Sequence, residues 1–318
     1  MMRSNSRKAR RLLPMAAIFS LPIVWGTTFA IVQRALGDVT PMAFVVIRFG
    51  LAGAFFLVIS KPARRGAKLL LIAQTPHERR FRRDMIILGL AIGAGYIFQT
   101  IGLLTTTSAK SAFLTSTTVI WTPLLAWAMG RERLTPQLLV AVLATVAGIF
   151  FLTQPLRAEG FLIGDGLSLA CALAFGVYII VIDRAMLRAK EFAADEHEAS
   201  IMVTSTQIIA GTIIFLICMP LIEVPRFHAT TFSVGSLVYT GIIATCMTGY
   251  LQSRYQHHVT PTTASIIYML EPVVAAAIAE IFLTERMGFL EMLGGGLIII
   301  GVIIAQVKLP NTRGSTKS

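Results

Sequence analysis

The sequence predicts an all-α membrane protein, with ten transmembrane helices arranged as two inverted five-helix repeats. Three observations lead to this fold class. Of the 318 residues, 55% are hydrophobic and only 14% are charged. The mean hydropathy is +0.73, and long apolar runs occupy about two thirds of the chain. A soluble domain carries about 25% charged residues, so much of this surface must face lipid.

Ten apolar runs are long enough to cross a bilayer, which requires roughly 20 mostly apolar residues. In order, they cover residues 12–33, 41–60, 84–104, 111–129, 136–154, 163–184, 200–222, 232–253, 261–283 and 288–308. The first run follows five basic residues, as in a signal peptide. It is too long for a cleaved apolar region, however, and no small-residue cleavage site follows it. We therefore expect it to persist as the first helix, with short turns between the later runs.

The distribution of Lys and Arg predicts the orientation in the membrane. With the N-terminus in the cytoplasm, 22 of the 28 Lys and Arg residues fall on the cytoplasmic side and five on the other. The positive-inside rule then places both termini in the cytoplasm and the multi-pass chain in the plasma (inner) membrane. The net charge of +12 does not indicate nucleic-acid binding, because the basic residues are spread between apolar segments.

The two halves of the chain are related by an internal repeat. An offset of 153 places Gln99 on Gln252 and Gly148 on Gly301, and an offset of 150 places Trp25-Gly26 on Phe175-Gly176. The predicted domains are residues 12–154 and 163–308, flanked by cytoplasmic tails 1–11 and 309–318. Five spans in each half force the second copy to enter the membrane from the opposite side. Inverted repeats of this kind are typical of secondary transporters.

Several short motifs resemble the drug/metabolite transporter superfamily, in particular its ten-helix branch with duplicated EamA-type domains. They are Trp25-Gly26, Arg48-Phe49, Gln99-Thr100-Ile101-Gly102-Leu103, Arg131-Glu132-Arg133-Leu134, Leu270-Glu271-Pro272 and Thr284-Glu285-Arg286. The resemblance extends from about residue 15 to residue 308. It implies export of amino acids, related metabolites or toxic organic compounds, and says little about the individual substrate.

Enzyme and cofactor motifs are absent from the sequence. It contains no ATP-binding Gly-rich loop, no His-Glu-x-x-His and no Gly-x-Ser-x-Gly. The adjacent pair His257-His258 lacks neighbouring carboxylates or cysteines and is a poor metal site. The three cysteines lie in apolar runs and are expected to be free thiols. We therefore expect neither an enzyme nor a bound cofactor or metal, and transport must be driven by a gradient.

Glu271 is the deepest ionisable residue, eleven residues into the ninth run. A charged side chain at this depth costs at least about 2.5 kcal/mol unless it is partnered or functional. Pro272 follows it and leaves the Tyr268 carbonyl without its helical donor, so the helix should be interrupted here. Glu271 is a candidate site for a proton, as the coupling ion, or for a cationic substrate group. The alternative is a structural carboxyl bonded to a neighbouring helix.

Other candidate residues are polar or aromatic side chains within the runs. Arg48 could hold a substrate carboxylate or lock the bundle through a carboxylate or a helix C-terminus. Gln99 and Gln252 could bind substrate from symmetry-related positions or join helices by hydrogen bonds. Four aromatic residues, Trp25, Tyr96, Tyr178 and Tyr268, lie on helices that the resemblance places around a central cavity. They could contact substrate or serve only in packing.

The predicted function is secondary transport of a small metabolite by alternating access, with export of amino acids or related compounds as the first hypothesis. Multidrug or organic-cation efflux, or an uncoupled facilitator on the same fold, is the alternative. Predicted partners are a small-molecule substrate and membrane lipids, without nucleic acid. A membrane-embedded enzyme acting on lipid is disfavoured, because no cluster of Asp or His occurs at one membrane face.

Overall fold

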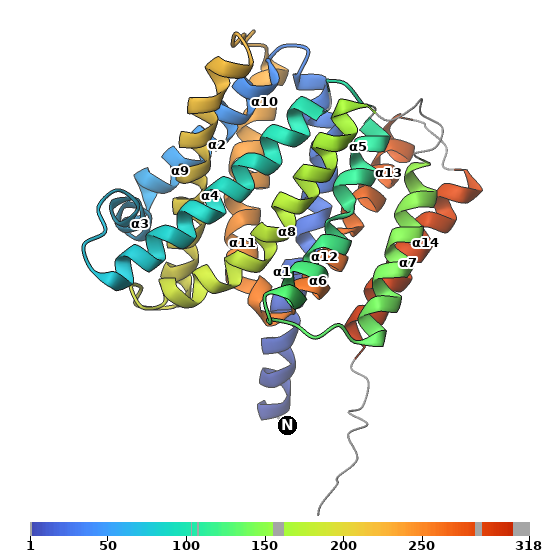
Figure 1. Cartoon of the computed structure of the whole chain (residues 1–318), viewed down its shortest axis with the longest axis horizontal. Coiled ribbons are helices and arrows are strands. Elements are labelled where there is room, and N and C mark those ends of the chain that lie inside the picture. The colour runs from blue at the N-terminus through green and yellow to red at the C-terminus, as the bar shows by residue number, and fades with distance from the viewer. Residues whose placement is uncertain (1, 103, 107, 155–161, 284–287, 308–318) are drawn as a thin grey trace, which may run out of the picture.

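The computed structural model describes residues 2–102, 104–106, 108–154, 162–283 and 288–307. These residues are almost entirely helical (Figure 1). The first half contains α1 (Met2–Ala35), α2 (Pro41–Ile59), α3 (Lys61–Leu71), α4 (Pro76–Gly102), α5 (Ser108–Ser116), α6 (Thr118–Ala128) and α7 (Pro136–Thr153). Within the described ranges, β pairing is limited to an isolated bridge between Val39 and Phe227.

The second half contains a further set of helical segments. They are α8 (Ile163–Ala189), α9 (Glu196–Ile222), α10 (Thr231–Val238), the π-helix η2 (Tyr239–Met247), α11 (Thr248–Tyr255), the 3₁₀ turn η3 (Gln256–His258), α12 (Pro261–Tyr268), α13 (Leu270–Leu283) and α14 (Phe289–Gln306). Eight segments in the described chain are long and apolar enough to cross a membrane, and two shorter apolar helices cover Leu13–Thr28 and Phe113–Ala128. The all-helical, multi-pass membrane fold is therefore confirmed.

Two helices are interrupted near mid-length. The run 111–129 divides into α5 and α6 at Thr117, and the run 261–283 divides into α12 and α13 at Met269. The second interruption has the expected cause, since Pro272 has no N–H to donate to the Tyr268 carbonyl. With the repeat offset of 153, Thr117 corresponds to Leu270, one residue from the second interruption. The two halves are thus broken at equivalent positions.

The basic segment after α2 differs from the expected short turn, because residues 61–71 form the helix α3. Ser60 starts this helix, accepting a hydrogen bond from the Ala63 backbone N at 3.3 Å through its side chain. Pro62 stands in the first turn, where its missing N–H costs nothing. α4 also begins earlier than expected, at Pro76 rather than at residue 84. A hydropathy window misses both features because their residues are charged.

Small residues let helices approach closely, as expected for helix packing in membranes. A Cβ added to Gly294 of α14 would overlap the backbone of Leu152 in α7. A Cβ added to Gly148 of α7 would lie 2.7 Å from the Gly294 carbonyl oxygen. The two glycines therefore allow direct backbone contact between α7 and α14.

The bundle has two ends. We call the end that carries the beginning of α1 the N-terminal face. Figure 1 shows that α4 begins, α8 ends and α14 ends at this lower face as well. The connections 35–41 and 223–230 lie at the opposite face, joined by a hydrogen bond from the His228 N to the Asp38 carbonyl oxygen at 2.8 Å. Residues can therefore be placed by depth between the two faces.

Candidate functional site

Five buried side chains form a continuous chain of hydrogen bonds, which we call the glutamine–tyrosine network. Its members come from five helical segments: Gln207 (α9), Tyr178 (α8), Gln252 (α11), Gln256 (η3) and Tyr268 (α12). Each is at most 6% exposed. The network extends from Gln207, near the middle of α9, to Gln256 in η3, and it joins these helical segments through side-chain hydrogen bonds.

The bonds of the network converge on Gln256 Oε1. Gln207 Nε2 donates to the Tyr178 hydroxyl at 3.1 Å, and that hydroxyl donates to Gln252 Oε1 at 3.3 Å. Gln252 Nε2 donates to Gln256 Oε1 at 3.0 Å, and the Tyr268 hydroxyl donates to the same oxygen at 3.0 Å. The hydrogen bonds offset the cost of removing these buried amides and hydroxyls from water.

The two ends of the network differ. At the N-terminal end, Gln256 Nε2 donates to the Ile179 carbonyl oxygen at 2.7 Å and to Asp183 Oδ1 at 3.1 Å. At the central end, Gln207 Oε1 is buried and accepts no hydrogen bond from a described residue. An unpaired buried acceptor costs about 1–3 kcal/mol, so this oxygen is a place where a donor from a ligand would be favourable.

Trp25 connects α1 to the network. Its ring packs edge-to-face against the Tyr268 ring, with centroids 5.2 Å apart and an interplanar angle of 71°. Its indole Nε1 donates to Thr248 Oγ1 at 3.1 Å. The ring is half-buried, so it presents aromatic surface beside Tyr268 while its polar edge is fixed.

Arg48 is 5% exposed and binds the π-helix η2. Its Nε donates to Thr245 Oγ1 at 2.8 Å, and its Nη2 donates to the Ala244 carbonyl oxygen at 3.2 Å. A π-helix shifts backbone bonding to the fifth residue and often occurs at functional sites. Arg48 thus uses its Nε and Nη2 donors to hold the π-helix η2. Thr245 and Thr248 lie one turn apart, so Arg48 and Trp25 contact neighbouring positions of one helix.

Tyr96 lies in an aromatic cluster rather than in the network. Its ring is 5.0 Å from Phe49 and 5.8 Å from Phe175, centroid to centroid. The Arg48 guanidinium carbon lies 5.3 Å from the centre of the Tyr96 ring, a cation–π distance. Of the predicted residues, Arg48 and Tyr96 therefore form a second group, which is held by ring and cation–π contacts and shares no hydrogen bond with the network.

Glu271 occupies the first turn of α13, directly after the interruption at Met269. Its side chain is half-buried. No donor among the described residues forms a hydrogen bond to its carboxylate, and the positive charge of Arg48 acts on it electrostatically. A carboxylate at this depth that is neither bonded nor fully buried is expected to face a protein cavity rather than lipid.

Gln99 stands apart from both groups. It is half-buried, three residues before the end of α4 at the opposite face. Its amide forms no hydrogen bond to any described residue. Of the eight residues predicted from the sequence, the structure joins Trp25, Tyr178, Gln252 and Tyr268, pairs Arg48 with Tyr96, and leaves Gln99 and Glu271 unbonded.

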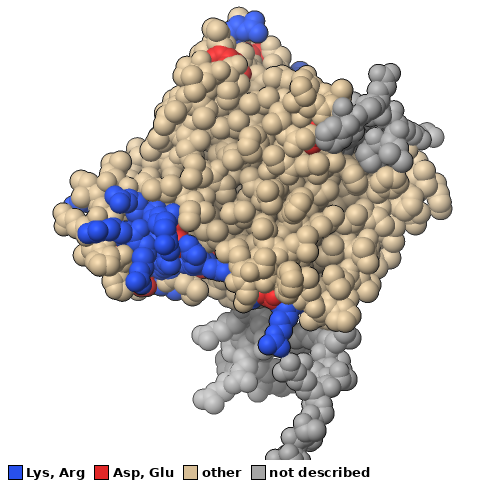
Figure 2. All heavy atoms as spheres, viewed as in Figure 1, with Lys and Arg blue, Asp and Glu red and all other residues tan. Residues whose placement is uncertain are grey.

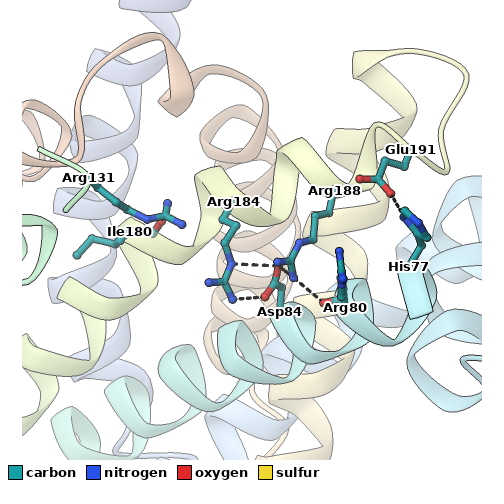
Figure 3. A network of polar contacts seen from close by, with 8 residues as sticks. All are labelled: His77, Arg80, Asp84, Arg131, Ile180, Arg184, Arg188 and Glu191. Atoms are coloured by element: carbon teal, nitrogen blue, oxygen red, sulfur yellow. Dashed lines mark hydrogen bonds and ion pairs between the residues drawn. The ribbon is translucent and has the colours of Figure 1, made fainter. Parts of the chain in front are cut away.

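Ion pairs hold the N-terminal face around Asp84 of α4. Figure 3 shows its fully buried carboxylate between two guanidinium groups of α8, those of Arg184 and Arg188. Arg188 also donates to the Arg80 carbonyl oxygen at 3.0 Å. His77 and Glu191 form an exposed pair nearby at 2.8 Å. A buried carboxylate with two cations is fully compensated, so α4 and α8 are fixed to each other here.

The sequence pairs Glu132-Arg133 and Glu285-Arg286 suggest gating or capping ion pairs at equivalent turns. Glu132 acts as a cap, since its Oε2 accepts from Thr262 N at 3.2 Å and from Thr262 Oγ1 at 2.6 Å at the start of α12. Glu285 and Arg286 lie outside the described residues. No group of three or more His, Cys, Asp or Glu residues in the described ranges could hold a metal ion.

Sequence reasoning missed Gln207, Gln256, Asp183, Thr245 and Thr248. Gln256 could have been found from its spacing, because it follows Gln252 by four residues and would place a second amide on the same helical face. It was missed because it lies beyond the end of the apolar run 232–253. Gln207 lies inside a run, in the polar stretch Thr204-Ser205-Thr206-Gln207. The partners of Arg48 could not be found, because a π-helix is not visible in hydropathy.

The sequence and the fold of the chain are similar to those of known proteins. The sequence profile of the EamA-like transporter family matches residues 12–154 and 162–306. An uncharacterized transporter of Archaeoglobus fulgidus is 29% identical over 301 residues, covering 94% of this chain and 88% of that protein. The uncharacterized transporter YoaV of Bacillus subtilis is 23% identical over 296 residues, covering 91% of this chain and 95% of that protein. One solved structure, at 17% identity, has a TM-score of 0.73 over 92% of this chain and 96% of its own, which shows the shared fold.

Proposed function

We propose that this chain, which belongs to the EamA-like transporter family, is a secondary transporter of the drug/metabolite transporter superfamily that exports amino acids or related small metabolites by alternating access. Ten spans in two inverted five-helix repeats carry the transport path. The N-terminal face is cytoplasmic, with both termini on that side of a bacterial inner membrane. The basic surface around α3 and α4 on this face supports that orientation.

The observation that carries the proposal is the pair of interruptions at repeat-equivalent positions. α5–α6 breaks at Thr117 and α12–α13 breaks at Met269. In secondary transporters, interrupted helices at corresponding positions of the two halves form the substrate and coupling-ion site. Here the second interruption places Glu271 one turn from Tyr268, which contacts Trp25. The binding site in this proposal lies between these side chains and Gln207 Oε1.

The polar contacts support one conformation of the transport cycle. The glutamine–tyrosine network and the Asp84 ion pairs tie α4, α8, α9, α11 and α12 together toward the N-terminal face. Gln99, near the opposite face, has no such bond. In alternating access, one side of the site is closed while the other can open. We infer that the network is the closed cytoplasmic gate.

The chemistry of the site favours a substrate with an ammonium group. An unbonded carboxylate at Glu271 and the aromatic faces of Trp25 and Tyr268 both attract cations. A zwitterionic amino acid adds a carboxylate, for which Arg48 is the available cation. The same carboxylate and rings would also accept an organic cation without a carboxylate, so multidrug efflux is the second candidate.

Counterflow in proteoliposomes tests the proposal. Vesicles loaded with unlabelled amino acids or organic cations are given a labelled member of each class, with and without a proton gradient. Accumulation of an amino acid that falls at least tenfold in Glu271→Gln would support the proposed site. Accumulation only of organic cations would favour the second candidate, and accumulation indifferent to any gradient would indicate an uncoupled facilitator. Unchanged transport in Glu271→Gln would remove Glu271 from the mechanism.

A further inference from the structure

The segment between α2 and the second turn of α4 carries more Lys and Arg than any other connection between apolar runs in the described chain. It contains Lys61, Arg64, Arg65, Lys68, Arg79, Arg80, Arg82 and Arg83, with Glu78 as its one carboxylate before Asp84. We call this the α3 basic surface. Figure 2 shows a broad blue patch of Lys and Arg in the region of α3 and the start of α4. Glu78 accepts hydrogen bonds from the backbone N of Gln74 and of Thr75, and its single negative charge offsets only one of these eight positive charges.

α3 has the surface of an interfacial helix. It is viewed almost along its axis in Figure 1, so it lies crosswise to α4 and α8, which run across the picture. Its buried side packs on α9, where Gly66 lies against Thr206 and Met202. Its four basic side chains are exposed. A helix that lies across the ends of the spans and presents cations is suited to the headgroup layer.

Exposed apolar side chains bracket these cations. Val58 and Ile59 at the end of α2 are 78% and 61% exposed, and Leu71 and Ile72 at the end of α3 are 72% and 57% exposed. A basic surface designed for a water-soluble polyanion would gain nothing from such side chains. Apolar groups beside cations are instead typical of binding at the boundary between headgroups and acyl chains of an anionic membrane.

An apolar groove begins beside this surface. It lies between α2, α9, η2 and α11, and its lining includes Phe55, Phe56, Ile201, Met247 and Tyr250. Arg64 reaches the same end of α2, where its Nη1 donates to the Leu57 carbonyl oxygen at 2.7 Å and to the Val58 carbonyl oxygen at 3.1 Å. A guanidinium group therefore stands within one turn of the groove's aromatic residues.

We propose that the α3 basic surface and this groove together bind an anionic phospholipid. The phosphate lies among Arg64, Arg65 and Lys68, and one acyl chain occupies the groove. Arg binds phosphate oxygens through paired N–H donors, and cytoplasmic leaflets supply anionic lipids. This site is separate from the glutamine–tyrosine network and from Glu271, and it does not depend on the transported substrate.

Native mass spectrometry of the purified full-length protein tests the headgroup part of the site. Phosphatidylglycerol and phosphatidylcholine with identical acyl chains are titrated separately. We expect wild type to bind phosphatidylglycerol at least tenfold more tightly. The variant Arg65→Gln/Lys68→Gln should lose at least fivefold of that affinity, with phosphatidylcholine unchanged. The matched control Arg133→Gln/Arg226→Gln, which removes two exposed charges elsewhere, should stay within twofold of wild type.

Two results would overturn the headgroup assignment: equal affinity of wild type for the two lipids, or an equal loss in the control variant. Displacement of phosphatidylglycerol by a short RNA at micromolar concentration would also overturn it, in favour of a nucleic-acid surface.

Met247→Trp tests the groove, because the indole would fill it. We expect weaker retention of phosphatidylglycerol with its preference over phosphatidylcholine preserved, and unchanged retention would contradict the acyl-chain assignment. Thermal unfolding of each variant verifies folding.

Discussion

Gln99 and Gln252 occupy equivalent positions in the two repeats, yet their surroundings differ completely. Gln252 is 3% exposed and bonds Tyr178 on one side and Gln256 on the other. Gln99 is half-buried and bonds no described residue. The sequence explains part of this difference, since Gln256 corresponds to Leu103 and Tyr268 to Thr115 under the same offset. Only the second repeat carries the side chains that build the network.

The comparison shows that duplication preserved the helices while the polar chemistry diverged. A perfectly symmetric pair of halves could close either side with the same contacts. Under the proposed mechanism, closure at the N-terminal face relies on buried amides and hydroxyls. Closure at the opposite face would have to rely on other contacts. The two gates are therefore expected to respond differently to mutation, and the following predictions test that expectation.

The largest effect is expected at Asp84, which ties the helix carrying Gln99 to the helix carrying Tyr178. Asp84→Ala leaves two guanidinium groups without their buried carboxylate. We expect a loss of about 3 kcal/mol in the free energy of unfolding, at the low end for a buried pair because both arginines remain 22–27% exposed. Denaturant unfolding in detergent micelles measures it. Glu191→Ala, which breaks the exposed pair with His77, should cost less than about 1 kcal/mol. Equal losses would show that the buried Asp84 ion pairs stabilise the fold no more than the exposed His77–Glu191 pair.

The second prediction compares the two glutamines directly, by replacing each with leucine. Gln252→Leu leaves the Tyr178 hydroxyl without its acceptor and removes one donor to Gln256, which should cost about 1–3 kcal/mol. Gln99→Leu removes no bond, so its cost should stay within about 0.5 kcal/mol. Unfolding of the two variants side by side in the same detergent measures both. A larger loss for Gln99→Leu would reverse the assignment of the closed gate.

The third prediction concerns two tyrosines from the original candidate set. Tyr268→Phe removes a buried hydrogen bond to Gln256 and should cost about 1 kcal/mol. Tyr96→Phe keeps its ring contacts and removes a hydroxyl that bonds no described residue, so unfolding should change little. The contrast depends on the hydroxyl alone, because both substitutions leave the aromatic ring in place. Matching losses would mean that ring packing, not the network, determines stability here.

The fold was predictable to the extent that hydropathy encodes it. Each apolar run corresponds to helical structure, and Pro272 correctly located the interruption before Glu271. The helix α3 was missed because its charged residues hide a buried stripe of Ala63, Gly66 and Leu69. Of the site, individual residues such as Trp25 and Gln252 could be named, because polar and aromatic groups stand out in apolar runs.

Their grouping could not be predicted. Gln207 and Tyr178 meet because α9 packs beside α8, a tertiary contact that no spacing in the sequence specifies. Arg48 could not be assigned a partner, because the carbonyl of Ala244 becomes its acceptor in the π-helix η2. Periodicity gives the face of a helix, whereas the neighbour of that face is set by the packing of the whole bundle.

The most direct test of the closed gate is a distance measurement across the N-terminal face. Spin labels at Leu187 and His258, both exposed, report on α8 and η3 by double electron–electron resonance, with the three native cysteines replaced by alanine. We expect a narrow distance distribution that is unchanged by Gln99→Leu and that becomes broader, with a longer mean distance, in Gln252→Leu. The same distribution in all three proteins would contradict the claim that the glutamine–tyrosine network holds this side closed.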